Sequence, residues 1–378
     1  MNLHKIKATL LILAVGTFAV SCEKENLEQS TTNLNAETMN KELILNPNSG
    51  KSAEIQVSEN IGIAVRNAVE PSECAPTELD EVVGVYIQQI IADPIALANN
   101  GIYSNINYYY SYLIDKGEQT FGAEGKFTSL MVKRERELSK FFELPIDIRV
   151  NGQHTANLND RNVWISVLSN FYGYNLPDGS FLPLTVQQAA QIADQYLALN
   201  EASPNLPENP YFATDGFASS NGTIVIGDGL VRWLAEAGVE ESIVWTGILA
   251  HEWSHQVQFN NYGEWYPIGA ADNLPEATRF TELEADFFAA YYMTHKRGAT
   301  YNWKRVEEFF ELFFQIGDCS FTSNGHHGTP AQRMEAARLG FELANDAQKQ
   351  GHILTVEELH EIFVEQISEV IPAPGSTK

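Results

Sequence analysis

Positive charge is scarce in this chain of 378 residues, which has 24 Lys and Arg against 49 Asp and Glu and a formal net charge of -25 at pH 7. Such a balance disfavours binding to nucleic acid or to anionic lipid, because the field of the protein repels phosphate groups. It favours solubility without specifying a substrate. We therefore expect no nucleic-acid partner.

Cysteine is scarcer still, with only Cys22, Cys74 and Cys319. None of them has the paired spacing of a cysteine zinc site. In an oxidising compartment Cys74 and Cys319 could form one disulfide, and two free buried thiols are the alternative. The chain also lacks an internal repeat and a phosphate-cradling glycine loop, because Gly325-His-His-Gly328 has no strand-to-helix context.

Long hydrophobic runs are absent after the N-terminus, where no stretch approaches ~18 continuous apolar residues. The N-terminal run Ala8–Val20 follows two lysines and is too short for a stable anchor helix, which predicts a secretory signal peptide over residues 1–21. Its ending, Ala-Val-Ser-Cys22, resembles a bacterial lipobox. That resemblance implies cleavage before Cys22 and lipidation of its thiol; an isolated apolar helix is the alternative.

Lipidation at Cys22 implies a lipid anchor in the outer membrane of a Gram-negative bacterium, with the protein facing the periplasm or the cell surface. The acidic opening Glu23-Lys-Glu25 is similar to the surface-export signal of some such lipoproteins. Residues 22–75 are polar and poor in aromatics, which is typical of a flexible tether with one short strand near 55–57. Residues 76–378 are expected to form one main domain.

The most informative residues are His251-Glu-Trp-Ser-His255, an H-E-x-x-H motif. Residues four apart on a helix lie about one turn and ~6 Å apart, so both imidazoles can point at one zinc ion. Glu252 lies about 100° further round the helix and can act as general base on a bound water. Apolar residues at helical spacing predict a buried helix for the motif: Ile243, Val244, Ile248, Leu249 and Val257.

A second helical stretch supplies two more acids, Glu282 and Asp286, again four residues apart. We expect Glu282 to be the third zinc ligand and Asp286 to accept the free ring N–H of His251, which would fix its orientation. A solvated helix face is the alternative, but the aromatic neighbours of these acids favour burial with a partner. Glu284 faces elsewhere and is expected to be solvated.

The loop Asn324-Gly-His-His-Gly-Thr-Pro330 offers His326 and His327 as donors to the oxyanion of a reacting carbonyl, and we take His327 as a catalytic candidate. Two alternatives are that these histidines cap the helix starting near Pro330 or lie idle at the surface. Arg333 could pair with one of the motif acids.

Three ordered segments resemble the signatures of the neutral zinc metallopeptidase family and, more loosely, of the wider gluzincins. They are HEWSHQVQ from His251, ELEADFFA from Glu282 and HGTPAQR from His327, within residues 223–341. The resemblance implies an α+β zincin fold, predominantly helical with a small mixed sheet. It also implies His251, His255 and Glu282 as ligands of one zinc ion and Glu252 as the catalytic base. Ser254, Gln256 and Phe287 depart from the family pattern, and none is an expected ligand.

The expected function is therefore that of a zinc-dependent endopeptidase, which hydrolyses peptide or protein substrates with a zinc-activated water and Glu252 as general base. Two alternatives stay open. One is a surface glycan- or ligand-binding lipoprotein, suggested by the tyrosines Tyr108–Tyr110 and Tyr112, although core packing is their commoner use. The other is an inactive zincin-like scaffold.

Elsewhere, capping residues and apolar periodicity predict helices over 77–94, 127–142, 303–314 and 355–371, and one that opens at Thr185. Strands are predicted at 145–150, before a turn at Asn151-Gly152, and at 163–168. The β-branched segment 221–227 is predicted to be a strand, either an edge strand along which substrate pairs or an ordinary sheet strand.

Overall fold

The computed structural model describes residues 43–46, 78–265, 274–316, 328–347 and 352–370. Several predictions fall outside these ranges: the signal peptide, the lipidation at Cys22, the tether over 22–75 apart from its residues 43–46, the strand near 55–57, the pairing of Cys74 with Cys319, and the roles of His326 and His327. They stay predictions.

Helices dominate the described chain, and the strands form two three-stranded sheets. The helices are α2 (Glu78–Ala92), α3 (Pro94–Tyr109), α4 (Thr128–Phe142), α5 (Arg161–Phe171), α6 (Val186–Ala202), α7 (Asp228–Glu236), α8 (Glu241–Trp265), α9 (Leu274–Thr294), α10 (Trp303–Ile316), α11 (Pro330–Ala347) and α12 (Val356–Val370). The strands are β1 (Ile44–Leu45), β2 (Arg149–Gln153), β3 (Tyr172–Asn175), β4 (Phe181–Pro183), β5 (Gly216–Ser219) and β6 (Thr223–Gly227). This composition confirms the predicted α+β class.

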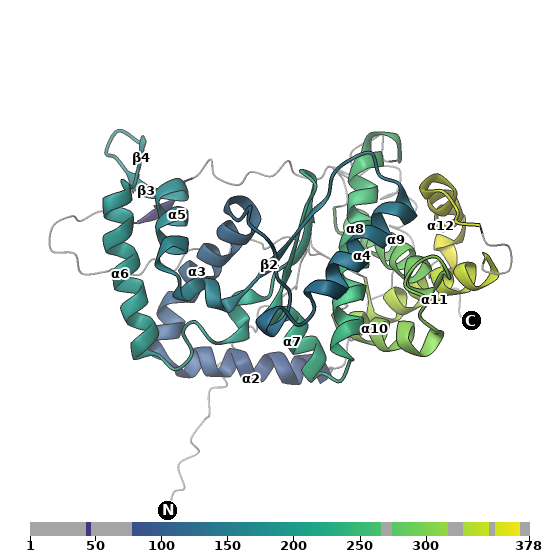
Figure 1. The fold of residues 1–378 in the computed structure, drawn as a ribbon, viewed down its shortest axis with the longest axis horizontal. Coiled ribbons are helices and arrows are strands. Elements are labelled where there is room, and N and C mark those ends of the chain that lie inside the picture. Colours follow the sequence, from purple (N-terminus) through teal and green to yellow (C-terminus); the bar gives the residue numbers. More distant parts are fainter. Residues whose placement is uncertain (1–42, 47–77, 266–273, 317–327, 348–351, 371–378) are drawn as a thin grey trace, which may run out of the picture.

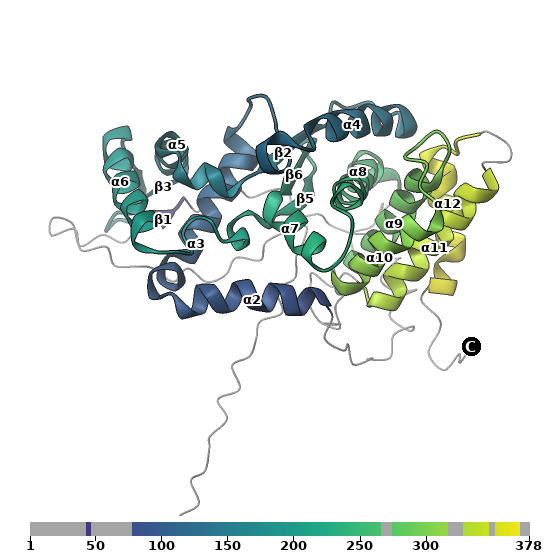
Figure 2. The same cartoon turned by 60° about the horizontal axis from the view of Figure 1, so that its bottom comes forward.

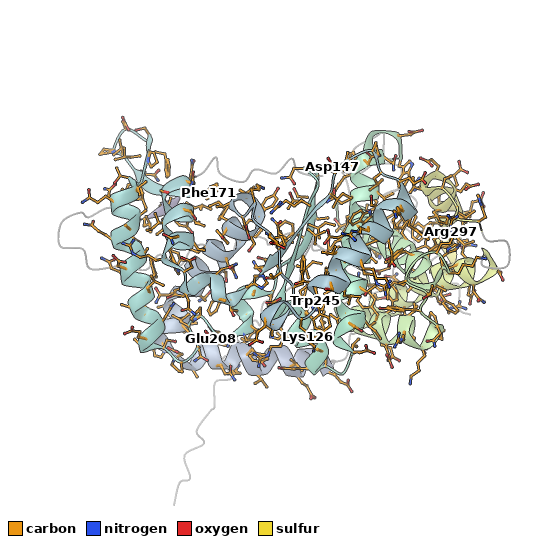
Figure 3. All side chains as sticks on the ribbon, viewed as in Figure 1. Lys126, Asp147, Phe171, Glu208, Trp245 and Arg297 are labelled. Carbon is orange, nitrogen blue, oxygen red and sulfur yellow. The ribbon has the colours of Figure 1, made fainter. Side chains whose placement is uncertain are left out.

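The larger-scale arrangement has a helical group on each side of the sheet β2-β6-β5, with α3, α5 and α6 on one side and α8 to α12 on the other (Figure 1). Helix α2 runs along the bottom from the α3 side of the molecule to the edge of the other group, where it contacts α10 (Figures 1 and 2). Side chains fill the space between the helices of each group (Figure 3). Among the described helices, no single one is long and apolar enough to cross a membrane; Glu81–Ala92 with Pro94–Ile114 passes only as a pair bent by 114°.

The predicted strand at 221–227 is present as β6, but it is the central strand of its sheet and not an edge. It pairs parallel with β2, Val150 opposite Ile224, and antiparallel with β5, Gly216 opposite Ile226. Every residue of β6 is buried, as expected for a β-branched run covered on both faces. The expectation that substrate pairs along this strand is therefore wrong, because both of its edges are occupied.

Two other local predictions are wrong. Residues 163–168 belong to helix α5, whose buried positions Val163, Trp164, Val167 and Leu168 follow the helical period. The side chain of Asp160 accepts a hydrogen bond from the backbone N–H of Asn162 and starts this helix. A short apolar run does not by itself distinguish a strand from a helix, and here the N-terminal cap at Asp160 favours the helix.

The predicted turn at Asn151-Gly152 is instead the middle of strand β2. Asn151 donates a hydrogen bond from its side-chain NH2 group to the backbone oxygen of Ser111 at 2.6 Å, so this donor is bonded inside the protein. A Cβ on Gly152 would lie 2.5 Å from the backbone oxygen of Thr120, so glycine permits a close backbone approach here. Asn151 and Gly152 look like a turn in the sequence, but tertiary contacts explain why these residue types stand in the middle of a strand.

The other predicted helices are confirmed as α2, α4, α6, α10 and α12. Helix α6 begins with the expected capping box, in which Thr185 and Gln188 bond each other's backbone N–H. The tyrosine run closes α3 and continues into a π-helical turn, η1 (Tyr110–Ile114). Tyr108 and Tyr112 contact Phe217 of β5 at ring-centroid distances of 5.4 and 5.3 Å, so these rings pack inside the protein.

Two large clusters of buried apolar side chains stabilise the described chain. One lies among α3, α5 and α6, where Trp164 stacks on Tyr196 with ring centroids 4.9 Å apart. The other surrounds α8 and extends over α9 to α12. Within it α9 and α11 pack closely: a Cβ on Gly340 would lie 2.1 Å from the backbone oxygen of Phe287. This approach brings α11 near the acids of α9.

Candidate metal centre

The H-E-x-x-H motif lies in the middle of α8, and every residue of this helix from Ile243 to Gln258 is buried. A helix buried on all faces fits the apolar lead-in that predicted it. The three motif side chains are almost inaccessible, with 1% of His251, 3% of Glu252 and 6% of His255 exposed. Polar groups this deep in a protein need specific partners.

The two histidines converge on Glu282 of α9. Helix α9 is a neighbour of α8 in the fold (Figure 2). The Nε2 atoms of His251 and His255 lie 3.2 Å apart. Glu282 Oε2 lies 3.3 Å from Nε2 of His251, and Glu282 Oε1 lies 3.4 Å from Nε2 of His255. The three residues that the sequence predicted as ligands thus form one buried group that could hold a metal ion.

The predicted contact between Asp286 and His251 is present, with Asp286 Oδ1 3.0 Å from His251 Nδ1. Arg333 of α11 binds the same carboxylate with two parallel hydrogen bonds. Its Nε lies 2.7 Å from Oδ2, and its Nη2 lies 2.8 Å from Oδ1. The guanidinium is 1% exposed and also lies 3.8 Å from Glu282 Oε2. The sequence left the role of Arg333 open, and the structure pairs it with Asp286.

The prediction that Glu284 is a solvated acid is wrong, because this residue is fully buried. Its Oε2 accepts a hydrogen bond from Gln258 at 2.9 Å, and its Oε1 lies 2.6 Å from Nδ1 of His360 on α12. The oxygen of the Gln258 side chain in turn lies 2.8 Å from Nδ1 of His255. Helix α12 covers the face of α9 that the sequence pattern assigned to solvent.

The acids also set the protonation of the histidines. Burial by itself lowers the pKa of His251, but the hydrogen bonds and charges of Asp286 and Glu282 outweigh it and raise the pKa to about 9. For His255, burial likewise lowers the pKa and attraction to Glu282 more than compensates, so its pKa is raised. This environment favours cations, and a bound metal ion would take the place of the proton on Nε2 of each ring while Nδ1 keeps its own.

Glu252 points toward the sheet. Its Oε1 would lie 3.9 Å from a Cβ placed on Gly216, the first residue of β5. The next polar residue of the motif, Gln256, donates to the backbone oxygen of Ser219 at the far end of β5, 3.0 Å away. The same side-chain nitrogen of Gln256 lies 3.3 Å from the backbone oxygen of Thr223 in β6, so both β5 and β6 lie beside the motif helix.

The start of α11 is capped by Thr329 and Gln332. One alternative from the sequence was that His326 and His327 cap this helix. The hydroxyl of Thr329 accepts from the backbone N–H of Gln332 at 3.3 Å, and Gln332 Oε1 accepts from the backbone N–H of Thr329 at 2.9 Å. This capping box positions the first turn of α11, which carries Arg333.

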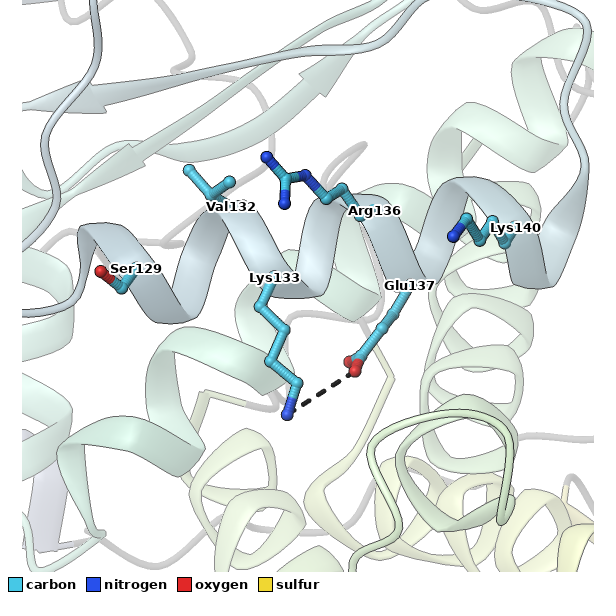
Figure 4. Close-up of a pocket in the computed structure, with 6 residues that line it drawn as sticks. All are labelled: Ser129, Val132, Lys133, Arg136, Glu137 and Lys140. Carbon is cyan, nitrogen blue, oxygen red and sulfur yellow. Dashed lines mark ion pairs between the residues drawn. The ribbon is translucent and has the colours of Figure 1, made fainter.

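A surface depression of about 390 Å³ lies on α4, away from these residues (Figure 4). Its lining consists of Ser129, Val132, Lys133, Arg136, Glu137 and Lys140. None of these residues belongs to the group around His251. The depression therefore carries no part of the candidate centre.

The residues that sequence reasoning missed are Gln258, Glu284 and His360. Gln258 follows His255 by three positions on the same helix, which is a usable signal for a side-chain contact. Nothing in the sequence relates His360 to α9. Comparison with protein-family models, with curated proteins and with solved structures found no match for this chain.

Proposed function

We propose that this protein is a zinc-dependent peptidase in which His251, His255 and Glu282 hold one zinc ion. The supporting observation is the spacing of the donor atoms. A tetrahedral zinc site with bonds of about 2.0–2.1 Å has donor atoms about 3.3–3.4 Å apart. The two Nε2 atoms lie 3.2 Å apart, close to this value. Each Nε2 atom also lies near a different oxygen of Glu282, at 3.3 Å from Oε2 and 3.4 Å from Oε1, and one donor atom from each of the three residues lies within 4.8 Å of the other two.

The donor set also fits zinc chemically. Two imidazole nitrogens and one carboxylate form a common ligand set of hydrolytic zinc sites, which leave a fourth position open. When bound there, zinc would act as a Lewis acid that lowers the pKa of water and polarises a carbonyl group. Asp286 and Arg333 would hold the His251 ring with Nε2 facing the metal.

Glu252 is the general base in this proposal. It lies next to His251 in the chain but outside the ligand group. In this role its carboxylate accepts a proton from the attacking water. The same carboxyl group would then donate that proton to the departing amine. Its burial favours both transfers, because solvent does not compete for the proton.

The resemblance to neutral zinc metallopeptidases, the zincin fold and the location belong to the same proposal. A chain lipidated at Cys22 and attached to the outer membrane would act on peptides or proteins outside the cytoplasm. The negative net charge supports this setting only in disfavouring nucleic acid and anionic lipid surfaces.

The test uses purified protein, its zinc content and a mixed peptide library. We expect one zinc per chain, loss of zinc in His251→Ala, and loss of cleavage in Glu252→Gln with zinc retained. Glu264→Gln is the matched control, because Glu264 is an exposed acid on the same helix α8.

Three outcomes would contradict the proposal in different ways. Stoichiometric zinc without cleavage of any peptide would favour the inactive zincin-like scaffold. A protein without zinc that binds oligosaccharides would favour the glycan-binding lipoprotein. Full activity in Glu252→Gln would remove this residue as the base and leave the metal site intact.

A further inference from the structure

The two histidines of the proposed centre are held in different ways. His251 contacts a carboxylate directly, through Asp286. His255 contacts an amide, because its Nδ1 lies 2.8 Å from Oε1 of Gln258. An amide can present either an acceptor or a donor to the ring, depending on which way it is turned. The groups bonded to the other end of the Gln258 amide therefore determine whether its oxygen or its NH2 group faces Nδ1 of His255.

Those groups determine one orientation of Gln258. Its Nε2 lies 2.8 Å from the backbone oxygen of Thr281 and 2.9 Å from Oε2 of Glu284, and both of these atoms accept hydrogen bonds. An amide nitrogen has two protons, and both are used here. The reversed amide would place its oxygen against two acceptors and its NH2 group against the ring. Glu284 and Thr281 thus hold the Gln258 oxygen toward His255.

This orientation determines the tautomer of His255. An imidazole whose Nδ1 faces an acceptor carries its proton there, which leaves the lone pair on Nε2. Nε2 is the atom that faces His251 and Glu282. A neutral ring with a free Nε2 lone pair is the form that binds a metal ion.

The chain of contacts continues to the C-terminal helix. Glu284 is fully buried, and its second oxygen lies 2.6 Å from Nδ1 of His360. The His360 ring stacks on Trp265 at the end of α8, with centroids 4.2 Å apart and planes 3° from parallel. Its side chain keeps 14% of its surface exposed. A buried carboxylate needs such a donor, because an uncompensated charge in the interior is costly.

We propose that Glu284 and His360 are positioning residues for the ligand His255 and act on it through Gln258. The inference rests on the proposed metal site and adds a second support to it, one that depends on docking of α12. Neither residue touches the metal or the substrate in this assignment. Their effect is on the orientation and tautomer of one ligand, and hence on metal affinity.

The experiment measures the zinc dissociation constant by competition with a chromophoric chelator, together with the visible spectrum of the cobalt-substituted protein. Removing a partner of a metal-bound histidine typically weakens metal binding about 10- to 100-fold. We expect Gln258→Met to weaken zinc binding by a factor within this range and Glu284→Gln to weaken it about tenfold, at the lower end. We expect both variants to alter the cobalt spectrum, which a loss of general stability would not do.

A double mutant separates a relay from two independent effects. If Glu284 acts through Gln258, the variant Gln258→Met/Glu284→Gln binds zinc no more weakly than Gln258→Met alone. Fully additive losses would overturn the inference. So would an unchanged zinc affinity in Glu284→Gln.

The His360 variants provide a second route should Glu284→Gln not fold. His360→Ala removes the donor to Glu284, whereas His360→Asn keeps an N–H donor. We expect weaker zinc binding in the first and recovery in the second. Equal affinity in both and in the natural protein would overturn the role of His360.

The matched control is Asp228→Asn. This change also disrupts a histidine–carboxylate contact of 2.6 Å, between Asp228 and His154, but at the start of α7. We expect unchanged zinc affinity. The natural protein separates the two claims: if it binds no zinc, the proposed function fails and this inference with it; if it binds zinc and the relay variants match it, only this inference fails.

Discussion

The two helical groups of this protein bury their polar groups in opposite ways. In α3, α5 and α6, which the structure describes in full, no buried residue carries a charge. Tyr103 there donates to the backbone oxygen of Tyr196 at 2.7 Å, and Trp164 donates to that of Leu158 at 2.9 Å. Among the residues of α8, α9 and α11 whose side chains the structure describes, eight ionisable ones are buried, namely His251, Glu252, His255, Arg279, Glu282, Glu284, Asp286 and Arg333.

The difference indicates what each group is for. Neutral hydrogen bonds satisfy a core that only needs to be stable, because they avoid the desolvation of charges. Buried charges are a weak source of stability, and well-packed apolar residues often replace them without loss. A concentration of them around one pair of histidines is therefore better explained by chemistry than by folding. The first group stabilises the fold, and the second holds the candidate site.

The largest effect should come from Glu252→Gln. Loss of general acid–base catalysis lowers hydrolysis by about 10²- to 10⁴-fold. Because the change also removes a buried acid, the free energy of unfolding should stay the same or rise. Peptide cleavage rates and urea unfolding of the same preparation check both. A clear loss of stability without loss of cleavage would show that Glu252 stabilises the fold and does not serve catalysis, which contradicts the comparison of the two helical groups.

Next comes Trp164→Ala in the neutral core. Removing a fully buried tryptophan should lower the free energy of unfolding by about 3–5 kcal/mol. Zinc affinity, measured on the folded fraction, should not change. Val186→Ala is the control, because Val186 on α6 is 65% exposed and the substitution should cost less than about 0.5 kcal/mol. Weaker zinc binding in Trp164→Ala would show that the two groups are not independent.

A smaller effect distinguishes the two histidines. Asp286→Asn weakens the direct support of His251 and should reduce zinc affinity about 10- to 100-fold. We expect a greater loss than in Glu284→Gln, where the support reaches His255 only through Gln258. Chelator competition on both variants gives the order. The opposite order would make the amide-mediated contact the more important one.

Tyr103→Phe should have a modest effect on stability alone. The phenol of Tyr103 bonds the backbone oxygen of Tyr196 and Oδ1 of Asn200, at 2.7 and 2.6 Å. Losing it should lower the free energy of unfolding by about 1 kcal/mol. Cleavage and zinc content should match those of the natural protein. A measurable drop in cleavage rate would contradict the division of roles.

The smallest effect concerns pH. Burial lowers the pKa of His154, but the hydrogen bond and charge of Asp228, together with the charge of Asp115 and a backbone hydrogen bond at Thr120, outweigh burial and raise the pKa above the ordinary 6.5. Protonated His154 therefore stabilises the folded protein fully below pH 6.5, and this contribution is lost as the pH rises through the folded-state pKa. In His154→Gln the free energy of unfolding should fall less steeply with rising pH across this window than in the natural protein. Identical slopes in both proteins would disprove the contribution.

Local geometry explains how much of the site was predictable. Helical spacing alone places His251 beside His255 and Glu282 beside Asp286. The packing of α9 on α8 then brings the two pairs together into one group. Capping residues and apolar periods likewise locate α2, α4, α6, α10 and α12. These features depend on residues a few positions apart, whose relative placement any helix reproduces.

Only the tertiary structure decided which faces of those helices are covered. Glu284 looked exposed because nothing near it in the sequence indicates α12, and Arg333 gained its partner through the close packing of α11 on α9. The same holds for β6, whose central position depends on β2, some seventy residues earlier in the chain. The sequence by itself determined the candidate ligands His251 and His255 and the buried helix that carries them. Packing between distant helices determined what holds these ligands in place, because burial is a property of neighbours and not of spacing.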